Sequence, residues 1–455
     1  MAVPGPETLR MTIPALIHLS RLGFSYLSRE ALGQRERQTN FMPEALRASL
    51  ERINGVPVSR ETAARLTEEL LHRLEAEDLG RRFYETLRNG WQGLRLIDFS
   101  HPARNAFHSA AELACGRGAG SFRPDITLFI NGLPLAMIEL KHRERTRSLQ
   151  AEYDRMLTRS QSREGRRYLQ CPQIWAFSDD HPEDPDRLMP LEGEYFATVM
   201  ANEFPIYAAG GRPSGRRIRL LPRSPEEESR ILADYGLGAS TRTRDFQRSL
   251  SPGKPTHRML TALFLPERLL FLLRYGIQYL EETDPEGGRM ITRRMLTARQ
   301  LAALKSLIRK ANRGWRNWTL PACGAAGEAA MNASMDSLLM DLYPEARLYR
   351  VSAGAAAAEP IPPAASSRLI PCESPQEVLD RLRAPSGRRS AGLNIVILPG
   401  AASLPEQRTG FIRRLRQADP EAIVILQAGS AHEDQLFSRF VPSPVLKISG
   451  GDPGP

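Results

Sequence analysis

Two carboxylates and one lysine have the types and spacing of a metal-dependent site. Asp125 follows a proline, and after thirteen intervening residues the chain reads Glu139-Leu140-Lys141. Because side chains alternate along a strand, Glu139 and Lys141 share one face. Two adjacent carboxylates repel each other unless a cation lies between them, and Mg²⁺ prefers oxygen ligands. The pattern predicts a Mg²⁺ site, with Mn²⁺ as a substitute, at Asp125, Glu139 and the carbonyl of Leu140. Lys141 would orient or activate a water and offset charge on a phosphate.

The segment between the two carboxylates predicts a β-hairpin. An Asn-Gly pair supplies the reversal, and Pro134 favours a three-residue loop at 131–133 that sets this proline opposite Ile130. Counting back along the strands, Asp125 then lies directly opposite Glu139, with Cβ atoms roughly 4.5–5.5 Å apart. The alternative is that the glutamate and the lysine are ordinary exposed strand residues. Against it, ionised groups beside the apolar run LAMI are costly to bury unless something binds them.

The elements around this hairpin predict a mixed α/β domain. Residues 7–30 and 43–78 have helical periodicity, and from Leu94 short β-rich runs follow, with a helix over 148–161. This gives an α/β domain over 1–185, with one small sheet flanked by helices and a helical N-terminal part.

The rest of the chain predicts a linker and a second domain. Residues 186–250 are rich in Asp, Pro, Arg, Gly and Ser, which favours an irregular basic linker with the domain boundary near residue 245. Over 251–455, helical periodicity at 259–280 and 290–311 is followed by strand-like runs that alternate with helices. That alternation is typical of a parallel, doubly wound α/β lobe.

The charge balance favours a polyanionic partner. The formal charge is +10 and the sequence pI is about 9.7, which attracts phosphate backbones. A nucleic acid is one such partner, and the basic residues beside the carboxylates are its candidate contacts, namely Arg143, Arg163, Arg166 and Arg167. The four cysteines have no zinc or disulfide spacing. Without a signal peptide or a long apolar run, we expect a cytoplasmic protein with no membrane partner.

A resemblance extends this interpretation. The segment SFRPDITLFINGLPLAMIELK resembles the nuclease centre of the restriction (R) subunit of type I restriction-modification enzymes, which has the PD-(D/E)xK restriction-endonuclease-like fold; LRLIDFSHPARNAFHSAAEL and LIHLSRLGFSYL resemble the segments before it. The resemblance implies a catalytic triad of Asp125, Glu139 and Lys141, and defence against foreign DNA. It also implies double-stranded DNA and the methylation and specificity subunits as partners. Gln150 and Tyr153 are the nearest counterparts of a supporting Gln and Tyr in that family, although here they lie one residue closer together.

The second half resembles that family's first RecA-like motor lobe in layout only. Gln300 lies at the position of the glutamine that contacts adenine in that family, and here it would be a vestigial adenine contact. The phosphate-loop window, residues 324–328, has Gly327 and Glu328 where a lysine and a hydroxyl are needed. The Asp-Glu-Ala-His motif is replaced at 399–402, and Thr-Gly-Thr-Pro at 427–430. We therefore expect no ATP binding or ATPase activity. The alternative for the whole chain is a catalytically silent DNA-binding or assembly subunit, or a truncated remnant, that kept the nuclease fold.

Overall fold

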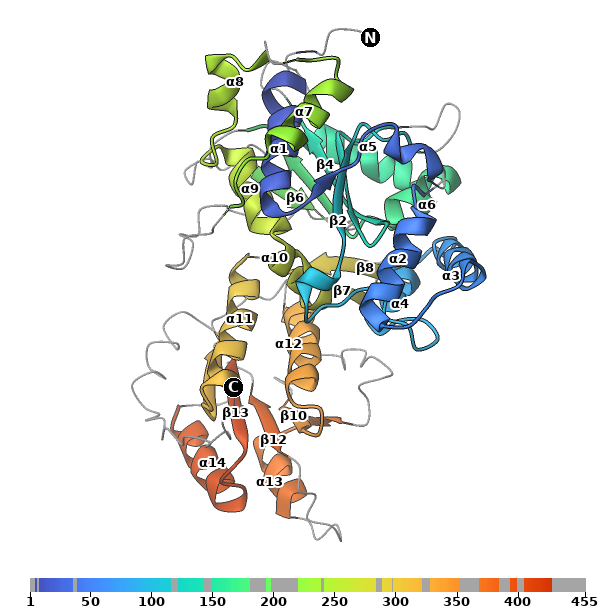
Figure 1. Ribbon diagram of the computed structural model, residues 1–455. Coiled ribbons are helices and arrows are strands. Elements are labelled where there is room, and N and C mark those ends of the chain that lie inside the picture. Colours follow the sequence, from blue (N-terminus) through green and yellow to red (C-terminus); the bar gives the residue numbers. More distant parts are fainter. Residues whose placement is uncertain are drawn as a thin grey trace, which may run out of the picture. The chain divides into compact units, whose positions relative to one another are not determined.

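The computed structural model describes residues 5, 8–35, 39–115, 122–141, 149–180, 194–197, 220–238, 241–283, 289–296, 298–320, 328–351, 368–383, 393–398 and 405–427. The chain divides into two compact units, Met1–Met295 and Leu296–Pro455. Figure 1 shows the elements of both units, and each unit is considered by itself. No helix in the described ranges is long and apolar enough to cross a membrane.

The first unit begins with helices, as the periodicity predicts. A π-helical turn at Thr8–Thr12 leads into α1 (Ile13–Leu22), and α2 (Pro43–Asn54), α3 (Arg60–Arg73) and α4 (Arg81–Asn89) follow. Short 3-10 turns lie at Ala31–Gln34 and Pro102–Arg104. Helix α1 is buried along almost its whole length, so its apolar residues belong to the core of this unit.

A mixed sheet forms the centre of the first unit. Among the described residues it has six strands in chain order: β1 (Ser25–Tyr26), β2 (Phe107–Ala111), β3 (Ile126–Ile130), β4 (Leu133–Leu140), β5 (Ile174–Ser178) and β6 (Glu194–Ala197). Strands β2, β3 and β4 are antiparallel neighbours, whereas β4 and β5 are parallel. The parallel pair requires a crossover, and α5 (Leu149–Gln161) and α6 (Arg163–Gln170) supply it. Their apolar residues pack on one face of the sheet in a cluster that includes Met137, Tyr168 and Trp175.

The segment expected to be an irregular linker contains helices of the first unit. Helices α7 (Pro225–Asp234) and α8 (Arg244–Ser249) each start at a side-chain cap, Ser224 and Thr243 respectively. The backbone amide of Tyr26 in β1 donates a 2.5 Å hydrogen bond to Glu227 Oε1 in α7. Ser and Thr are common in linkers but are also strong N-caps, so composition alone obscured two short helices.

The first unit also extends beyond the expected domain boundary. Helices α9 (Pro255–Phe264) and α10 (Pro266–Phe271) and a π-helical turn at Leu272–Gly276 lead into a hairpin of β7 (Ile277–Thr283) and β8 (Arg289–Met295). Most of these strand residues, 277–280 and 290–295, fall in the stretches 259–280 and 290–311, which were expected to be helical. Helix α9 packs against α1. The backbone amide of Thr256, in the first turn of α9, donates a 3.1 Å hydrogen bond to Asp180, which lies just after β5. These contacts explain why the division falls after Met295 rather than near residue 245.

The second unit contains the expected parallel sheet. Its strands are β9 (Asn317–Leu320), β10 (Arg347–Val351), β11 (Leu369–Cys372), β12 (Asn394–Leu398) and β13 (Ile423–Gln427), and the order across the sheet in the described part is β11-β10-β12-β13-β9, with every neighbouring pair parallel. The helices are α11 (Ala298–Asn312), α12 (Glu328–Leu342), α13 (Pro375–Arg383) and α14 (Pro405–Ala418).

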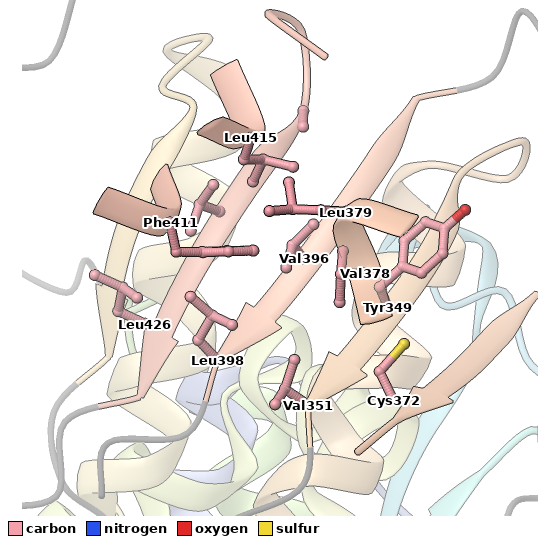
Figure 2. Packing of buried hydrophobic residues seen from close by; sticks show 12 residues of the cluster. Tyr349, Val351, Cys372, Val378, Leu379, Val396, Leu398, Phe411, Leu415 and Leu426 are labelled. Atoms are coloured by element: carbon pink, nitrogen blue, oxygen red, sulfur yellow. The ribbon is translucent and has the colours of Figure 1, made fainter. Parts of the chain in front are cut away.

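Helices cover both faces of this second sheet. Figure 2 shows one face, where Val396 and Leu398 of β12 meet Leu379 of α13 and Phe411 of α14. Tyr349 of β10 belongs to the same cluster. Arg350 follows it in the strand and therefore points to the opposite face, where it forms an ion pair with Asp336 of α12. The unit is therefore doubly wound, as the alternation of strands and helices predicts.

Candidate functional site

The β3–β4 hairpin sets the two carboxylates opposite each other. Its turn has two residues, Asn131 and Gly132, and Ile130 pairs with Leu133. The predicted three-residue loop is therefore wrong. A β-bulge follows at once, because Phe129 pairs with Pro134 but Leu128 pairs with Ala136.

Beyond the bulge the register returns to the predicted one. Ile126 pairs with Ile138, and one step further along the same ladder sets Asp125 against Glu139. The extra residue that we assigned to the loop is instead the bulged residue of β4, four residues before Glu139.

The turn is held in place from three sides. The Asn131 side chain accepts a 2.8 Å hydrogen bond from Ala106 N and donates one of 2.8 Å to Leu96 O. The Gly132 carbonyl accepts a 2.9 Å bond from Met42 N. At Gly132, φ is +83°, and a Cβ there would lie 2.7 Å from Met42 O. Only glycine fits this position without a shift of backbone, so local sequence fixes where the hairpin reverses.

Backbone contacts fix Asp125 and the end of β4. Leu140 N donates a 2.7 Å hydrogen bond to Asp125 Oδ2, so the aspartate side chain lies against the β4 backbone. Since the N–H and C=O of one strand residue point to the same side, the Leu140 carbonyl also points towards Asp125. Lys141 N donates a 2.9 Å bond to Ser178 O at the end of β5. These contacts bring the two predicted carboxylates and the predicted carbonyl ligand together.

Glu139 is a buried acid with an unsatisfied oxygen. The residue is 3% exposed, and its Oε1 has no hydrogen-bond partner among the described residues. Burial, and next the charge of Asp125, hold the pKa of Glu139 well above its ordinary value, against the opposing effect of Lys141. Lys141 Nζ lies 3.6 Å from Glu139 Oε2. A buried carboxylate kept beside a second one is costly unless a cation compensates both.

Two residues that sequence reasoning missed complete the cluster. Glu152 of α5 is 1% exposed, and its Oε2 lies 3.4 Å from Lys141 Nζ. Arg155, one helical turn further along, forms an ion pair with Glu152. Burial raises the pKa of Glu152, but the hydrogen bond from Arg155 and the charge of Lys141 outweigh it and leave this pKa below its usual value. The available signal was the Glu-x-x-Arg spacing on a helix, which alone does not indicate a contact with Lys141.

The two residues proposed to support cleavage lie on the same helix. Tyr153 is 3% exposed, and its ring meets Trp175 and Phe177 edge-on at centroid distances of 6.4 and 6.0 Å. This tyrosine is therefore a core residue next to the site. Gln150 lies in α5, but its side chain is outside the described ones.

The predicted DNA contacts are only partly described. Arg166 and Arg167 of α6 form ion pairs with Glu77 and Glu75, which follow α3, so both contribute to packing within the unit. Arg143 lies outside the described residues, and Arg163 is in α6 with its side chain not described. The predicted phosphate contacts of these four residues stay a prediction.

The segments that resemble motor motifs are only partly described in the second unit. The window expected to replace a phosphate loop lies between β9, which ends at Leu320, and α12, which begins at Glu328; residues 321–327 are outside the described ones. Gln427 ends β13 and donates a 2.6 Å hydrogen bond to Asn332 of α12. Gln300 is buried in the first turn of α11. Residues 399–402 and 428–430 are not described.

The donor set of the first unit suits a Mg²⁺ ion. In the described ranges no group of three or more His, Cys, Asp or Glu side chains is arranged around a common metal position. Mg²⁺, however, is usually bound by one or two carboxylates together with waters and substrate phosphates. Asp125, the Glu139 Oε1, which has no hydrogen-bond partner within the described ranges, and the nearby Leu140 carbonyl meet that requirement. The residues present therefore fit the metal.

Comparison with known proteins identifies the part of the chain that carries this site. Residues 6–182 match the family described as "Type I restriction enzyme R protein N terminus". Residues 6–182 therefore belong to this family. A search of curated proteins found no match. The R-protein N-terminal region contains the β3–β4 hairpin, α5 and α6, and it is consistent with a restriction role and compatible with a nuclease.

Proposed function

We propose that the chain is a Mg²⁺-dependent DNA endonuclease of the restriction type, in which an R-protein N-terminal region of PD-(D/E)xK fold hydrolyses phosphodiester bonds. The observation that carries the proposal is the buried Glu139 carboxylate opposite Asp125: its Oε1 has no hydrogen-bond partner in the described part of the chain, and Lys141 Nζ lies 3.6 Å from its Oε2. A protein that used these residues only for stability would gain by replacing the buried charges with apolar side chains.

Each group of the cluster has a defined task in this proposal. Asp125, Glu139 and the Leu140 carbonyl would hold Mg²⁺, or Mn²⁺ in its place. When bound, the metal supplies Lewis-acid polarisation of a phosphate oxygen and lowers the pKa of a water. The Lys141 ammonium, held on the same face as Glu139, donates hydrogen bonds to that water or to the phosphate and offsets charge as the phosphate gains its fifth oxygen.

The substrate and partners follow from the same family. Double-stranded DNA is the proposed substrate, in agreement with the formal charge of +10. Methylation and specificity subunits of a restriction-modification complex are the proposed partners, and the cytoplasm is the proposed location. These proposals extend the restriction role of residues 6–182 to the whole chain.

For the second unit we propose a RecA-like lobe without ATPase activity. The support is its parallel, doubly wound sheet together with the sequence at the motif positions. Phosphate binding needs a lysine and a hydroxyl after the glycine-rich loop, and here the chain has Gly327 and Glu328. Gln427 stands where the family has the first threonine of Thr-Gly-Thr-Pro, and it is bonded to Asn332 within the unit.

The test is cleavage of a supercoiled plasmid by the purified full-length protein. Nicked and linear products are measured with Mg²⁺ or with EDTA, each with and without ATP. The variants are Asp125→Asn, which keeps the shape of the side chain, and Asp154→Asn, a matched control at an exposed position of α5. We expect Mg²⁺-dependent cleavage by the wild type and Asp154→Asn, unaffected by ATP, and none by Asp125→Asn.

The other outcomes separate the alternatives. Equal DNA binding by the wild type and Asp125→Asn with no cleavage by either, in Mg²⁺ or Mn²⁺, would reject the enzyme and leave the assembly-subunit interpretation. Cleavage that requires ATP would reject the inactive motor lobe. Cleavage that survives Asp125→Asn would assign the activity to other residues or to a contaminant.

A further inference from the structure

Lys141 is shared between two buried carboxylates that come from different elements. Its Nζ lies 3.6 Å from Glu139 Oε2 on its own strand and 3.4 Å from Glu152 Oε2 on α5. The lysine side chain is 16% exposed and that of Glu152 is 1% exposed. The motif assigns tasks to Glu139 and Lys141, but it assigns none to Glu152.

Burial of the Glu152 charge needs a reason beyond helix packing. An ionised carboxylate removed from water loses several kcal/mol of solvation unless cations surround it. Arg155 supplies one of these cations through its ion pair with Glu152, and Lys141 supplies the other. An uncharged side chain at position 152 would avoid this cost, so the geometry points to a task for the charge itself.

That task follows from the competition for Lys141. Any cation held by Asp125 and Glu139 takes up the negative charge of Glu139, so Glu139 then attracts Lys141 less. Glu152 remains as the counter-charge that keeps the ammonium beside the carboxylate pair. A lysine side chain has about 2 kcal/mol of rotamer entropy, and without an anchor it would spend much of its time elsewhere.

We propose that Glu152 is a positioning residue that holds the Lys141 ammonium at the Asp125–Glu139 pair, and that Arg155 allows Glu152 to remain ionised there. This inference rests on the proposed nuclease function and adds a residue to it. Arg155 has a side chain 37% exposed, so it closes the charge cluster on the side nearer to solvent. The order across the cluster is then carboxylate pair, Lys141, Glu152 and Arg155, with opposite charges in contact at each step.

The test is a double-mutant cycle on the cleavage rate of the full-length protein. Single-turnover rates at saturating Mg²⁺ and plasmid are compared for the wild type, Glu152→Gln, Lys141→Ala and the double variant. We expect Glu152→Gln to cleave about 10- to 100-fold more slowly, the loss typical of a misplaced catalytic group, with the plasmid concentration for half-maximal rate unchanged. The double variant should be no slower than Lys141→Ala, because Glu152 acts only through Lys141.

A structural role would give a different result. Losses that multiply in the double variant would overturn the proposal, and so would a Glu152→Gln protein that cleaves as fast as the wild type. Asp154→Asn, on the same helix, is the control and should cleave normally. If Glu152→Gln does not fold, as judged by circular dichroism, Glu152→Asp takes its place in the cycle, since it keeps the charge but withdraws it from Lys141. No cleavage by the wild type would overturn the nuclease function and this inference together, whereas wild-type cleavage with multiplying losses would overturn this inference alone.

Discussion

Replacement of Glu139 by glutamine should make the protein more stable without metal and inactive with it. The carboxylate is 3% exposed, and burial and Asp125 together penalise its ionised form. Glutamine has nearly the same shape but no charge to desolvate. The change therefore removes a cost of folding and, at the same time, a proposed metal ligand.

The expected gain can be worked out from the contacts. Directly opposed strand side chains about 5 Å apart repel by about 3 kcal/mol when both are ionised, at an effective dielectric constant of about 20. Attraction across the 3.6 Å between Glu139 Oε2 and Lys141 Nζ offsets this by about 5 kcal/mol on the same scale. The attraction exceeds the repulsion by about 2 kcal/mol, and desolvation of several kcal/mol outweighs that difference. Because Lys141 keeps Glu152 as a partner, we expect the variant to gain about 1–2 kcal/mol in the free energy of unfolding.

The direction in which folding stability changes with pH follows from the raised pKa of Glu139. In the unfolded chain this side chain ionises near its ordinary value, whereas in the folded protein it stays protonated to higher pH. Between these two pKa values the unfolded state binds fewer protons, so wild-type stability falls as pH rises. The stabilisation of the Glu139→Gln variant relative to the wild type should therefore be absent near pH 4 and present at pH 8.

The assay is thermal unfolding in EDTA and in Mg²⁺ at both pH values. At pH 8 in EDTA the variant should melt higher, by about 2–4 °C for each kcal/mol. Mg²⁺ at about ten times its Kd should stabilise the wild type by about 1.4 kcal/mol and the variant much less. A variant that is less stable than the wild type in EDTA would refute the desolvation argument, and equal stabilisation of both by Mg²⁺ would place the metal elsewhere.

Three further changes test the framework around the site and the core of the second unit. Gly132→Ala should destabilise the first unit by about 3 kcal/mol or more and slow cleavage, since the new Cβ would lie 2.7 Å from a backbone carbonyl; urea unfolding with wild-type stability would contradict the tight turn. His257 is buried with its pKa lowered to about 4, so the unfolded chain binds more protons from about pH 6.5 down to 4 and stability falls by about 3 kcal/mol over that range. His257→Gln should lose less stability over the same pH range. If urea unfolding gave the same pH dependence of stability for this variant and the wild type, His257 would not be its cause. Asp336→Asn should cost the second unit about 3 kcal/mol, because it leaves Arg350, whose side chain is only 16% exposed, without its counter-charge; an unchanged melting temperature would argue that water already compensates this arginine.

The positions of strands could be predicted from the sequence where side-chain alternation and burial alone determine them. The run from Ile126 to Leu140 is apolar with a single turn signal, and the structure has β3 and β4 there. In the second unit, apolar runs that alternate with helical periodicity gave a parallel sheet, and the ladders are parallel. In each case, short-range side-chain alternation and burial determine the result.

The residues that the sequence did not reveal depend on tertiary contacts. Glu152 becomes significant only because α5 brings it to 3.4 Å from Lys141, and spacing along one helix carries no information about that distance. The sequence did not predict the hairpin of β7 and β8 for the same reason. Apolar residues recur there at spacings that suit a helix, and pairing of the two strands along their length overrides that local preference.

The β3–β4 hairpin shows why a wrong turn still gave the right partners at the site. Strand faces alternate with a period of two, so a change of one residue in the loop would move every β4 side chain to the other face. A two-residue turn alone would do this and would set Asp125 opposite the wrong residue. The bulge between Leu128 and Phe129 restores the missing residue. Glu139 is the only acidic side chain of β4, and the restored register sets it opposite Asp125, where one bound cation could compensate both charges.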